Sequence, residues 1–169
     1  YFGFNPCANS TDCETKCSED DQCEGYSTKN HKSICLGDRH TCAILENGDV
    51  KCWGDGQYGR LGYGNTNDQD NPPSSTISLG APALSIYCGK YHTCAILNNR
   101  EFECWGRNDF GQLGYGNTYD KNSPGGNVYN HGNNYPIEMS LGRYHTCVIF
   151  SDDGLFCWGR NYYGQLGDG

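Results

Sequence analysis

The sequence predicts a mainly β protein, in which three copies of one supersecondary unit follow a small disulfide-rich module at the N-terminus. The first observation is a His-Thr-Cys motif that recurs at His40, His92 and His145, a period of just over fifty residues. A fixed period of this length indicates one structural unit used repeatedly. The second is composition, since 24 glycines and 13 tyrosines in 169 residues favour short strands and tight turns. The third is an even count of 12 cysteines, which indicates a disulfide framework and an oxidising compartment.

Charge and cysteine spacing exclude several classes of function. The net charge of −8 argues against a nucleic-acid partner, because phosphate binding requires clustered Lys and Arg. No Cys-x2-Cys pair occurs, so the spacing typical of zinc sites is absent and we expect no metal or other cofactor. No apolar run approaches the ~18 residues of a membrane span, and no signal peptide is visible. Because the chain begins at Tyr1, we expect a processed form or an excerpt.

Residues 1–33 form the predicted N-terminal module. Four cysteines crowd into this polar stretch, and Thr11-Asp12-Cys13-Glu14 reads as a capping box, which predicts a short helix from about Asp12 to Asp20. Asn9 begins the sequon Asn-Ser-Thr and is a candidate glycosylation site.

The cysteine spacing of this module resembles the core of the apple, or PAN, domain. The resemblance lies in the pattern Cys13-x3-Cys17-x5-Cys23, which Gly-Tyr-Ser follows after one residue. It implies that Cys17 pairs with Cys23 and Cys13 with a cysteine of a later strand, Cys35. That would leave Cys7 and Cys88 for each other.

Each repeat predicts a β-hairpin closed by a disulfide bond. In the first repeat, residues 41–45 and 50–53 are β-prone, and Asn47-Gly48 between them is a strong hairpin signal. A three-residue loop places Cys42 directly opposite Cys52, where a non-hydrogen-bonded pair has Cα atoms about 4.5 Å apart, a distance that a disulfide can span. The same ten-residue spacing predicts two further disulfide bonds, Cys94–Cys104 and Cys147–Cys157.

The turns and the connectors differ among the repeats. Gly48 supplies the left-handed turn residue in the first copy, whereas Arg100 stands at that place in the second and Gly154 lies one position later in the third. The connectors 65–85 and 117–137 are rich in Asn, Pro, Gly and Ser, and each ends in a short apolar run. These runs contain Ile77 and Leu79 in the first connector and Ile137 and Met139 in the second. We expect them to supply loops and an additional strand.

The full repeat resembles that of the regulator of chromosome condensation family. The resemblance rests on Gly-x-x-His-Thr-Cys-Ala-x-Leu, followed by Cys-Trp-Gly-x-Asn-x-x-Gly-Gln-Leu-Gly-x-Gly, and covers residues 34–169. It implies propeller blades of four strands around a channel, here as repeats 34–85, 86–138 and 139–169. The cysteine-paired variant is typical of extracellular members. The family's founding activity, nucleotide exchange on a nuclear GTPase with chromatin binding, does not suit an acidic, disulfide-rich chain with three copies.

Three blades form an open, incomplete propeller, because closed propellers use about four to eight. The end blades would then present bare faces and unpaired strand edges. Three completions are possible. The chain is an excerpt of a longer protein, several copies close a ring, or copies dock head to tail, a heterologous contact that makes a filament if it does not close.

The repeated residues of each blade have structural interpretations. We expect the three motif histidines to be buried and hydrogen-bonded rather than metal ligands or bases, since each lies on a different blade. Trp53, Trp105 and Trp158 are expected to pack in the core or between blades. Gly59, Gly62 and Gly64 are expected to serve turns, because no helix follows them.

No set of residues predicts catalysis. The oxygen-rich segment 67–71 hints at calcium but lacks the Gly and the distal Glu of an EF-hand loop, so we expect a solvated loop. No nucleophile–base pair is discernible, and we expect no catalytic residue and no enzyme activity.

Aromatic residues in the loop after each Trp-Gly are the best candidates for exposed contacts, because they offer large rigid area at little entropic cost. They are Tyr58, Phe110, Tyr162 and Tyr163. We therefore expect a secreted or cell-surface structural protein that self-associates with copies of itself, such as a fibre subunit. The alternative is a propeller module of a larger receptor that binds a glycan or a protein, which predicts more repeats beyond Gly169.

Overall fold

The computed structural model describes residues 31–126 and 132–168 of a chain that divides into two compact units, Tyr1–Asn30 and His31–Gly169. The second unit begins three residues before the boundary that we placed between residues 33 and 34. The expected helix, the Cys17–Cys23 bond and the sequon at Asn9 lie outside the described residues. Among the described residues, no helix is long and apolar enough to cross a membrane.

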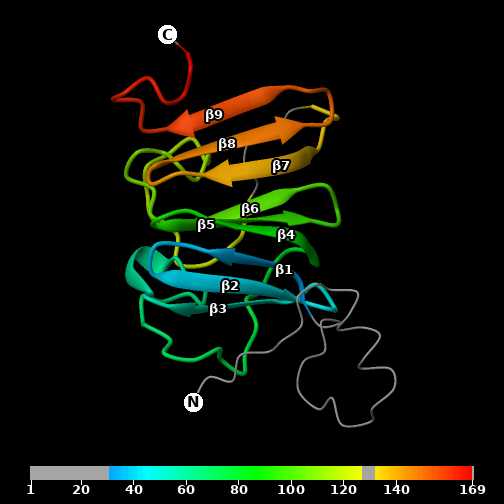
Figure 1. The fold of residues 1–169 in the computed structure, drawn as a ribbon, viewed down its shortest axis with the longest axis vertical. Coiled ribbons are helices and arrows are strands. Elements are labelled where there is room, and N and C mark those ends of the chain that lie inside the picture. Colours follow the sequence, from blue (N-terminus) through cyan, green and yellow to red (C-terminus); the bar gives the residue numbers. More distant parts are fainter. Residues whose placement is uncertain (1–30, 127–131, 169) are drawn as a thin grey trace, which may run out of the picture. The chain divides into compact units, whose positions relative to one another are not determined.

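Three antiparallel sheets of three strands make up the described unit, so the prediction of a mainly β protein with three blades is confirmed (Figure 1). Blade one contains β1, β2 and β3, blade two contains β4, β5 and β6, and blade three contains β7, β8 and β9. Their bounds are β1 His31–Leu36, β2 His40–Leu45, β3 Val50–Gly54, β4 Ala83–Cys88, β5 His92–Leu97, β6 Phe102–Gly106, β7 Pro136–Leu141, β8 His145–Phe150 and β9 Leu155–Gly159.

The hairpin of each blade has the register that the cysteine spacing predicts. Cys42 lies opposite Cys52 in the β2–β3 pair, and the same opposition recurs in the β5–β6 and β8–β9 pairs. All three predicted bonds are present, each with its Cα atoms 4.1 Å apart. The bonds therefore hold the two strands of every hairpin in one register.

Cys35 forms a fourth disulfide bond with Cys88, so the pairing of Cys13 with Cys35 and of Cys7 with Cys88 is wrong. Cys35 lies on β1 and Cys88 on β4, which are the first strands of successive blades. These strands pack against each other, which brings the two Cα atoms to 5.4 Å. The bond thus joins blade one to blade two.

Among the described residues, the outer edges of blades one and two lack the fourth strand that the resemblance implies. Instead of a fourth strand, isolated bridges pair Ile77 with Val50 and Gln69 with Gly54 at the edge of β3, and Lys121 with Gly106 at the edge of β6. The first connector thus contributes single bridging residues and, at its end, the start of β4. The second connector ends in the start of β7, the strand that contains Ile137 and Met139.

The hairpin turns show how the chain tolerates different residues at one left-handed position. Gly48 has φ 87°, and the equivalent Arg100 and Asp153 have φ 73° and 63°. In blade three it is therefore Asp153, and not Gly154, that takes the left-handed conformation. Side chains other than Gly pay a conformational cost there.

Two apolar clusters fill the spaces between successive blades. Ile44 and Val50 of blade one pack with Ala95, Leu97 and Trp105 of blade two. The second cluster joins Ile96, Phe102 and Leu113 of blade two to Met139, Val148 and Phe150 of blade three. Each blade therefore buries one face against its neighbour, which is how stacked repeats obtain a continuous core.

Candidate functional site

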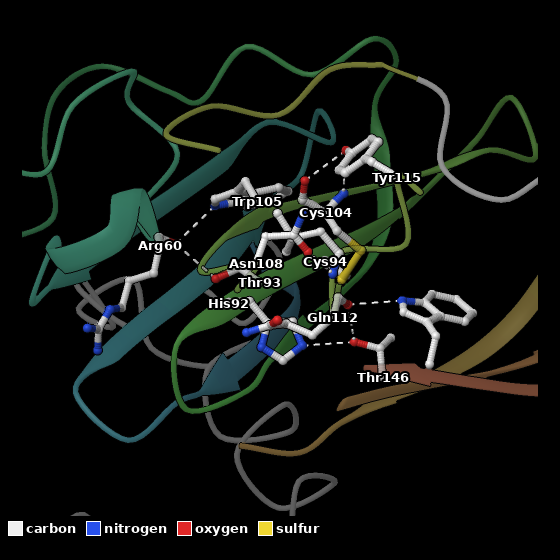
Figure 2. The surroundings of a disulfide bond; sticks show 12 residues. Arg60, His92, Thr93, Cys94, Cys104, Trp105, Asn108, Gln112, Tyr115 and Thr146 are labelled. Atoms are coloured by element: carbon white, nitrogen blue, oxygen red, sulfur yellow. Dashed lines mark hydrogen bonds between the residues drawn. A yellow bond between two sulfur atoms is a disulfide. The ribbon is translucent and has the colours of Figure 1, made fainter. Parts of the chain in front are cut away.

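A hydrogen-bond network that we call the interblade lock joins blade one to blade two (Figure 2). His40 of blade one and Thr93 of blade two are 2.9 Å apart between Nε2 and Oγ1. The Thr93 hydroxyl donates to the main-chain oxygen of Arg60 at 2.9 Å, and the Trp105 indole N–H donates to the same oxygen at 2.9 Å. Because the Thr93 hydroxyl donates its proton to Arg60 O, the Thr93 oxygen must accept the hydrogen bond from His40. The ring proton of His40 therefore lies on Nε2.

The same lock recurs between blades two and three. His92 lies 2.8 Å from the Thr146 hydroxyl, and that hydroxyl donates to the main-chain oxygen of Gln112 at 2.8 Å. Trp158 donates to this oxygen at 3.0 Å. Figure 2 shows Arg60 and Gln112 on opposite sides of blade two, each beside one of its two interfaces. A main-chain oxygen in the loop after Trp-Gly of one blade thus accepts hydrogen bonds from the Thr and the Trp of the following blade.

Burial keeps the histidines of the lock neutral. It lowers the pKa of His40 to about 4, and the nearby Arg60 charge acts in the same direction. It lowers the pKa of His92 to about 3, with smaller effects from the neighbouring histidines. The prediction of buried, hydrogen-bonded histidines is confirmed for these two, while His145 is half-buried. The lock is a structural device with no reactive group.

Blade one presents a face that no described residue covers, which we call the leading face. Its Ile34 is 61 % exposed, whereas the residues at the same register position in blades two and three, Ile86 and Met139, are 3 % and 4 % exposed. Thr41 and Trp53 occupy the positions of the lock residues Thr93 and Trp105. Within the described ranges no blade supplies an acceptor for them, and both are half-buried.

Blade three presents the opposite kind of face, which we call the trailing face. Its Leu155 is 66 % exposed, whereas the equivalent Val50 and Phe102 are 0 % and 5 % exposed. His145 stands at the position from which His40 and His92 bind the next blade. The chain therefore carries both halves of one more interblade contact, the leading face and the trailing face, at opposite ends of its stack of blades.

Aromatic rings and cations gather at the end of the hairpins where each motif histidine lies. There the loop before the histidine runs beside the loop after Trp-Gly, as shown by Arg107 N–H donating to Tyr91 O at 3.0 Å and Arg160 N–H donating to Tyr144 O at 2.9 Å. We call this region the arginine–aromatic surface. Its rings belong to Tyr58, Tyr91, Phe110, Tyr144, Tyr162 and Tyr163, and its cations are Arg39, Arg60, Lys90, Arg107, Arg143 and Arg160.

The rings of this surface form a continuous ladder across both blade boundaries. Ring centroids lie 5.7 Å apart from Tyr58 to Tyr91, 5.5 Å from Tyr91 to Tyr144, 5.1 Å from Tyr144 to Phe110 and 6.1 Å from Phe110 to Tyr162. All four residues predicted for exposed contacts lie on it, but only Tyr162 and Tyr163 are exposed, whereas Tyr58 and Phe110 are half-buried.

Sequence reasoning missed the central members of this surface, Tyr91 and Tyr144, and all of its arginines. Both tyrosines immediately precede a motif histidine, so an alignment of the three repeats at that position would have shown Arg39, Tyr91 and Tyr144 together. Hydrogen bonds to Tyr144 and Tyr91 raise the pKa of the Arg143 guanidinium.

The remaining candidate residues serve local structure. Trp105 is fully buried between blades, while Trp53 and Trp158 are half-buried. Gly59, Gly62 and Gly64 all have positive φ, as expected for turn residues. In the oxygen-rich segment 67–71, Asp68 accepts a hydrogen bond from Gly56 N–H at 2.8 Å.

Two further places offer no chemistry. Cys35, Cys42 and Cys88 form the one group of potential metal ligands found among the described residues, and all three are in disulfide bonds. A hollow of about 460 Å³ lies between β9 and the loop after β6, and no titratable side chain lines it.

Sequence and structure comparisons agree on one family. The profile described as "Regulator of chromosome condensation (RCC1) repeat" matches residues 32–60, 84–112 and 137–165, and a second profile with the same description matches 47–96 and 104–149. The ultraviolet-B receptor UVR8 of Arabidopsis thaliana is 34 % identical over 138 residues, which cover 82 % of this chain and 31 % of the receptor. The E3 ubiquitin-protein ligase HERC2 of Homo sapiens is 29 % identical over 148 residues, which cover 86 % of this chain and 3 % of the ligase.

Among solved structures, yeast RCC1 (Prp20) bound to Kap60 superposes with a TM-score of 0.69 and 22 % identity, covering 84 % of this chain and 32 % of that one. This likeness shows a shared fold. The chain spans about a third or less of each of these proteins. Three copies of the repeat profile, three sheets at one period and a common fold lead to one assignment: the chain belongs to the family of proteins built from RCC1 repeats.

Proposed function

We propose that this chain is an extracellular, non-enzymatic interaction protein that assembles with copies of itself by docking the trailing face of one copy on the leading face of the next. The observation that carries the proposal is the interblade lock, which is used at both internal boundaries and whose two halves recur, uncovered by any described residue, on the two faces. Four disulfide bonds among the described residues support an oxidising, extracellular setting.

The internal boundaries indicate which contacts the docked faces would make. His145 would bind Thr41 of the next copy, and the main-chain oxygen of Gln165 would accept from Trp53 of the next copy, as Gln112 accepts from Trp158. Ile34 would enter an apolar pocket that includes Leu155. Full burial of one such side chain stabilises by about 1.5–3 kcal/mol, so several are needed to offset the cost of association.

Such a contact is heterologous, since two different faces meet. It therefore propagates into a filament unless the rotation between copies closes a ring. A fibre subunit or a closed ring of copies both follow from the same interface.

Sedimentation velocity of the native, oxidised chain over a concentration series tests the proposal. The wild-type chain is expected to form a series of oligomers. Ile34→Asp blocks only the leading face and Leu155→Asp blocks only the trailing face, so each variant alone should be monomeric. An equimolar mixture of the two should form dimers and stop there, because each partner retains one complementary face.

Leu84→Asp is the matched control, because Leu84 is 50 % exposed on β4 of the middle blade and belongs to neither end face. It should assemble like the wild type. A wild-type chain that stays monomeric at its highest soluble concentration would reject the proposal, as would a mixture of the two blocked variants that fails to dimerise.

A further inference from the structure

The arginine–aromatic surface concentrates positive charge on an acidic protein. It carries six of the chain's 12 basic residues, although the chain has a net charge of −8. Three carboxylates lie among these cations. Asp38 pairs with Lys90 at 3.0 Å, Asp55 with Arg60 at 3.5 Å and Asp109 with Arg107 at 2.6 Å. Six cations against three carboxylates leave an excess of three positive charges.

A comparison of the blades shows that the excess arises at two places. One is the position two residues before the motif histidine, which holds Asp38, Lys90 and Arg143 in turn, and the other is a pair of positions in the loop after Trp-Gly. Blade one has Asp55 after Trp-Gly and Arg60 five residues later, and the two form an ion pair with the Arg60 side chain fully buried. Blade two has Arg107 and Gln112 at these positions, and blade three has Arg160 and Gln165. In blades two and three the acid has thus become an arginine, and the buried arginine has become a neutral glutamine.

Two arginines of the surface lack an acidic partner in the described part of the chain. Arg143 is exposed, and its guanidinium carbon lies 4.9 Å from the centre of the Tyr144 ring. Arg160 lies 4.3 Å from the centre of the Tyr162 ring, and its Nε–H is buried without a hydrogen-bond partner. A buried donor without a partner is destabilising.

Cation–π contacts with Tyr144 and Tyr162 hold these arginines in place. The fork of a guanidinium matches a carboxylate in two parallel hydrogen bonds. The exposed rings of Tyr162 and Tyr163 beside them supply apolar contact area for the rest of a ligand.

From this arrangement we infer that the arginine–aromatic surface is a docking site for a carboxylate-rich peptide segment of a partner protein, with Arg143 and Arg160 as the principal carboxylate-binding residues. A protein segment fits better than a nucleic acid, because the three interspersed carboxylates and the overall negative charge oppose a dense row of phosphates. Peptide carboxylates can be spaced to meet the unpaired arginines and to avoid these acids. The inference does not depend on blade docking, since it uses side chains at one end of the hairpins, whereas docking would use the main-chain oxygen of Gln165 in the same loop.

The test is fluorescence anisotropy with a fluorescein-labelled octaglutamate peptide and the oxidised chain. Binding is expected to weaken with added salt, and the double variant Arg143→Gln/Arg160→Gln is expected to weaken it by at least about tenfold, as loss of two charge-assisted contacts predicts. Arg100→Gln/Lys121→Gln is the matched control, because it removes the same charge away from the surface and should leave affinity within about twofold.

Tyr162→Ala/Tyr163→Ala provides a second measurement that leaves the charge unchanged, and it should also reduce affinity. Far-UV circular dichroism of each variant shows whether it is folded, and sedimentation shows whether it still assembles. A loss of peptide affinity can then be distinguished from a loss of folding or of blade docking. The inference would be overturned if octaglutamate bound no better than labelled octaglutamine, or if the Arg143/Arg160 variant bound like the control. A heparin hexasaccharide or an oligothymidylate that binds more than tenfold tighter than octaglutamate would also overturn it.

Discussion

Replacing Thr93 by Val should destabilise the chain by about 2–3 kcal/mol although the two side chains have nearly the same shape. Thr93 is fully buried, and its hydroxyl makes two hydrogen bonds of the interblade lock, one from His40 and one to Arg60 O. A typical hydrogen bond contributes about 1 kcal/mol net, and a buried polar group left without a partner costs about 1–3 kcal/mol. Arg60 O keeps the bond from Trp105, so the main loss falls on His40.

His40 makes this substitution more costly than the loss of a single bond. Its Nδ1 is already buried without a hydrogen-bond partner, so Thr93→Val leaves both ring nitrogens unpaired. The ring cannot escape by protonation at neutral pH, because burial lowers the pKa of His40 to about 4. The extra methyl group of Val recovers only part of the loss.

Urea unfolding of the oxidised chain, followed by tryptophan fluorescence, measures the effect, and the chain supplies its own control. Thr41→Val makes the same chemical change on the leading face, where the described residues offer the hydroxyl no partner. At a dilution at which the chain is monomeric, it should change the free energy of unfolding by less than about 0.5 kcal/mol. Thr93→Ser keeps the hydroxyl and should cost less than Thr93→Val. Equal effects of Thr93→Val and Thr41→Val would refute the lock as a source of stability.

Three further predictions follow from the folded structure. The free energy of unfolding should fall as pH falls from 6.5 towards 4 for His40 and towards 3 for His92, because the folded pKa lies below the unfolded value and the unfolded chain therefore binds more protons. At pH 5 each histidine contributes a loss of about 2 kcal/mol. Urea midpoints measured across this pH range would show the loss, and an Asn substitution at either histidine should reduce the pH dependence. Removing the bond between blades one and two with Cys35→Ser/Cys88→Ser should cost roughly 3–4 kcal/mol given its sequence separation of 53, and a thermal midpoint equal to that of the wild type would contradict this. Asp153→Gly should stabilise by about 0.5 kcal/mol by relieving a left-handed conformation at φ 63°, whereas Glu46→Gly, which has no such strain to relieve, should not.

The hairpins could be predicted from the sequence because their determinants are local. The Asn-Gly turn and the ten-residue cysteine spacing lie within one short segment, and the period of two fixes which residues oppose each other. The same locality explains why Cys42–Cys52 and its two equivalents were predicted correctly. A register set within a dozen residues leaves little for tertiary structure to change.

The Cys35–Cys88 bond was missed because its determinant is the packing of two blades. Each cysteine lies on the first strand of its own repeat, and only the stacking of β1 on β4 brings them together. A pairing taken from the apple-domain resemblance placed Cys35 with the N-terminal module instead. The separation of 53 residues, almost one repeat, was the available signal, since equivalent strands of adjacent blades are neighbours in space.

The candidate site shows how one loop can serve both stability and recognition. The interblade lock uses the main-chain oxygen of residue 60 or 112, and not its side chain, so Arg60 and Gln112 serve equally as acceptors for the following blade. The side chain at that position, and the one five residues before it, can therefore change without breaking these hydrogen bonds. Blade one uses this freedom for an Arg60–Asp55 pair in which the arginine is buried, whereas blades two and three place Arg107 and Arg160 among the tyrosines. A repeat that holds its neighbours through backbone atoms thereby leaves its side chains available to build a surface that differs from blade to blade.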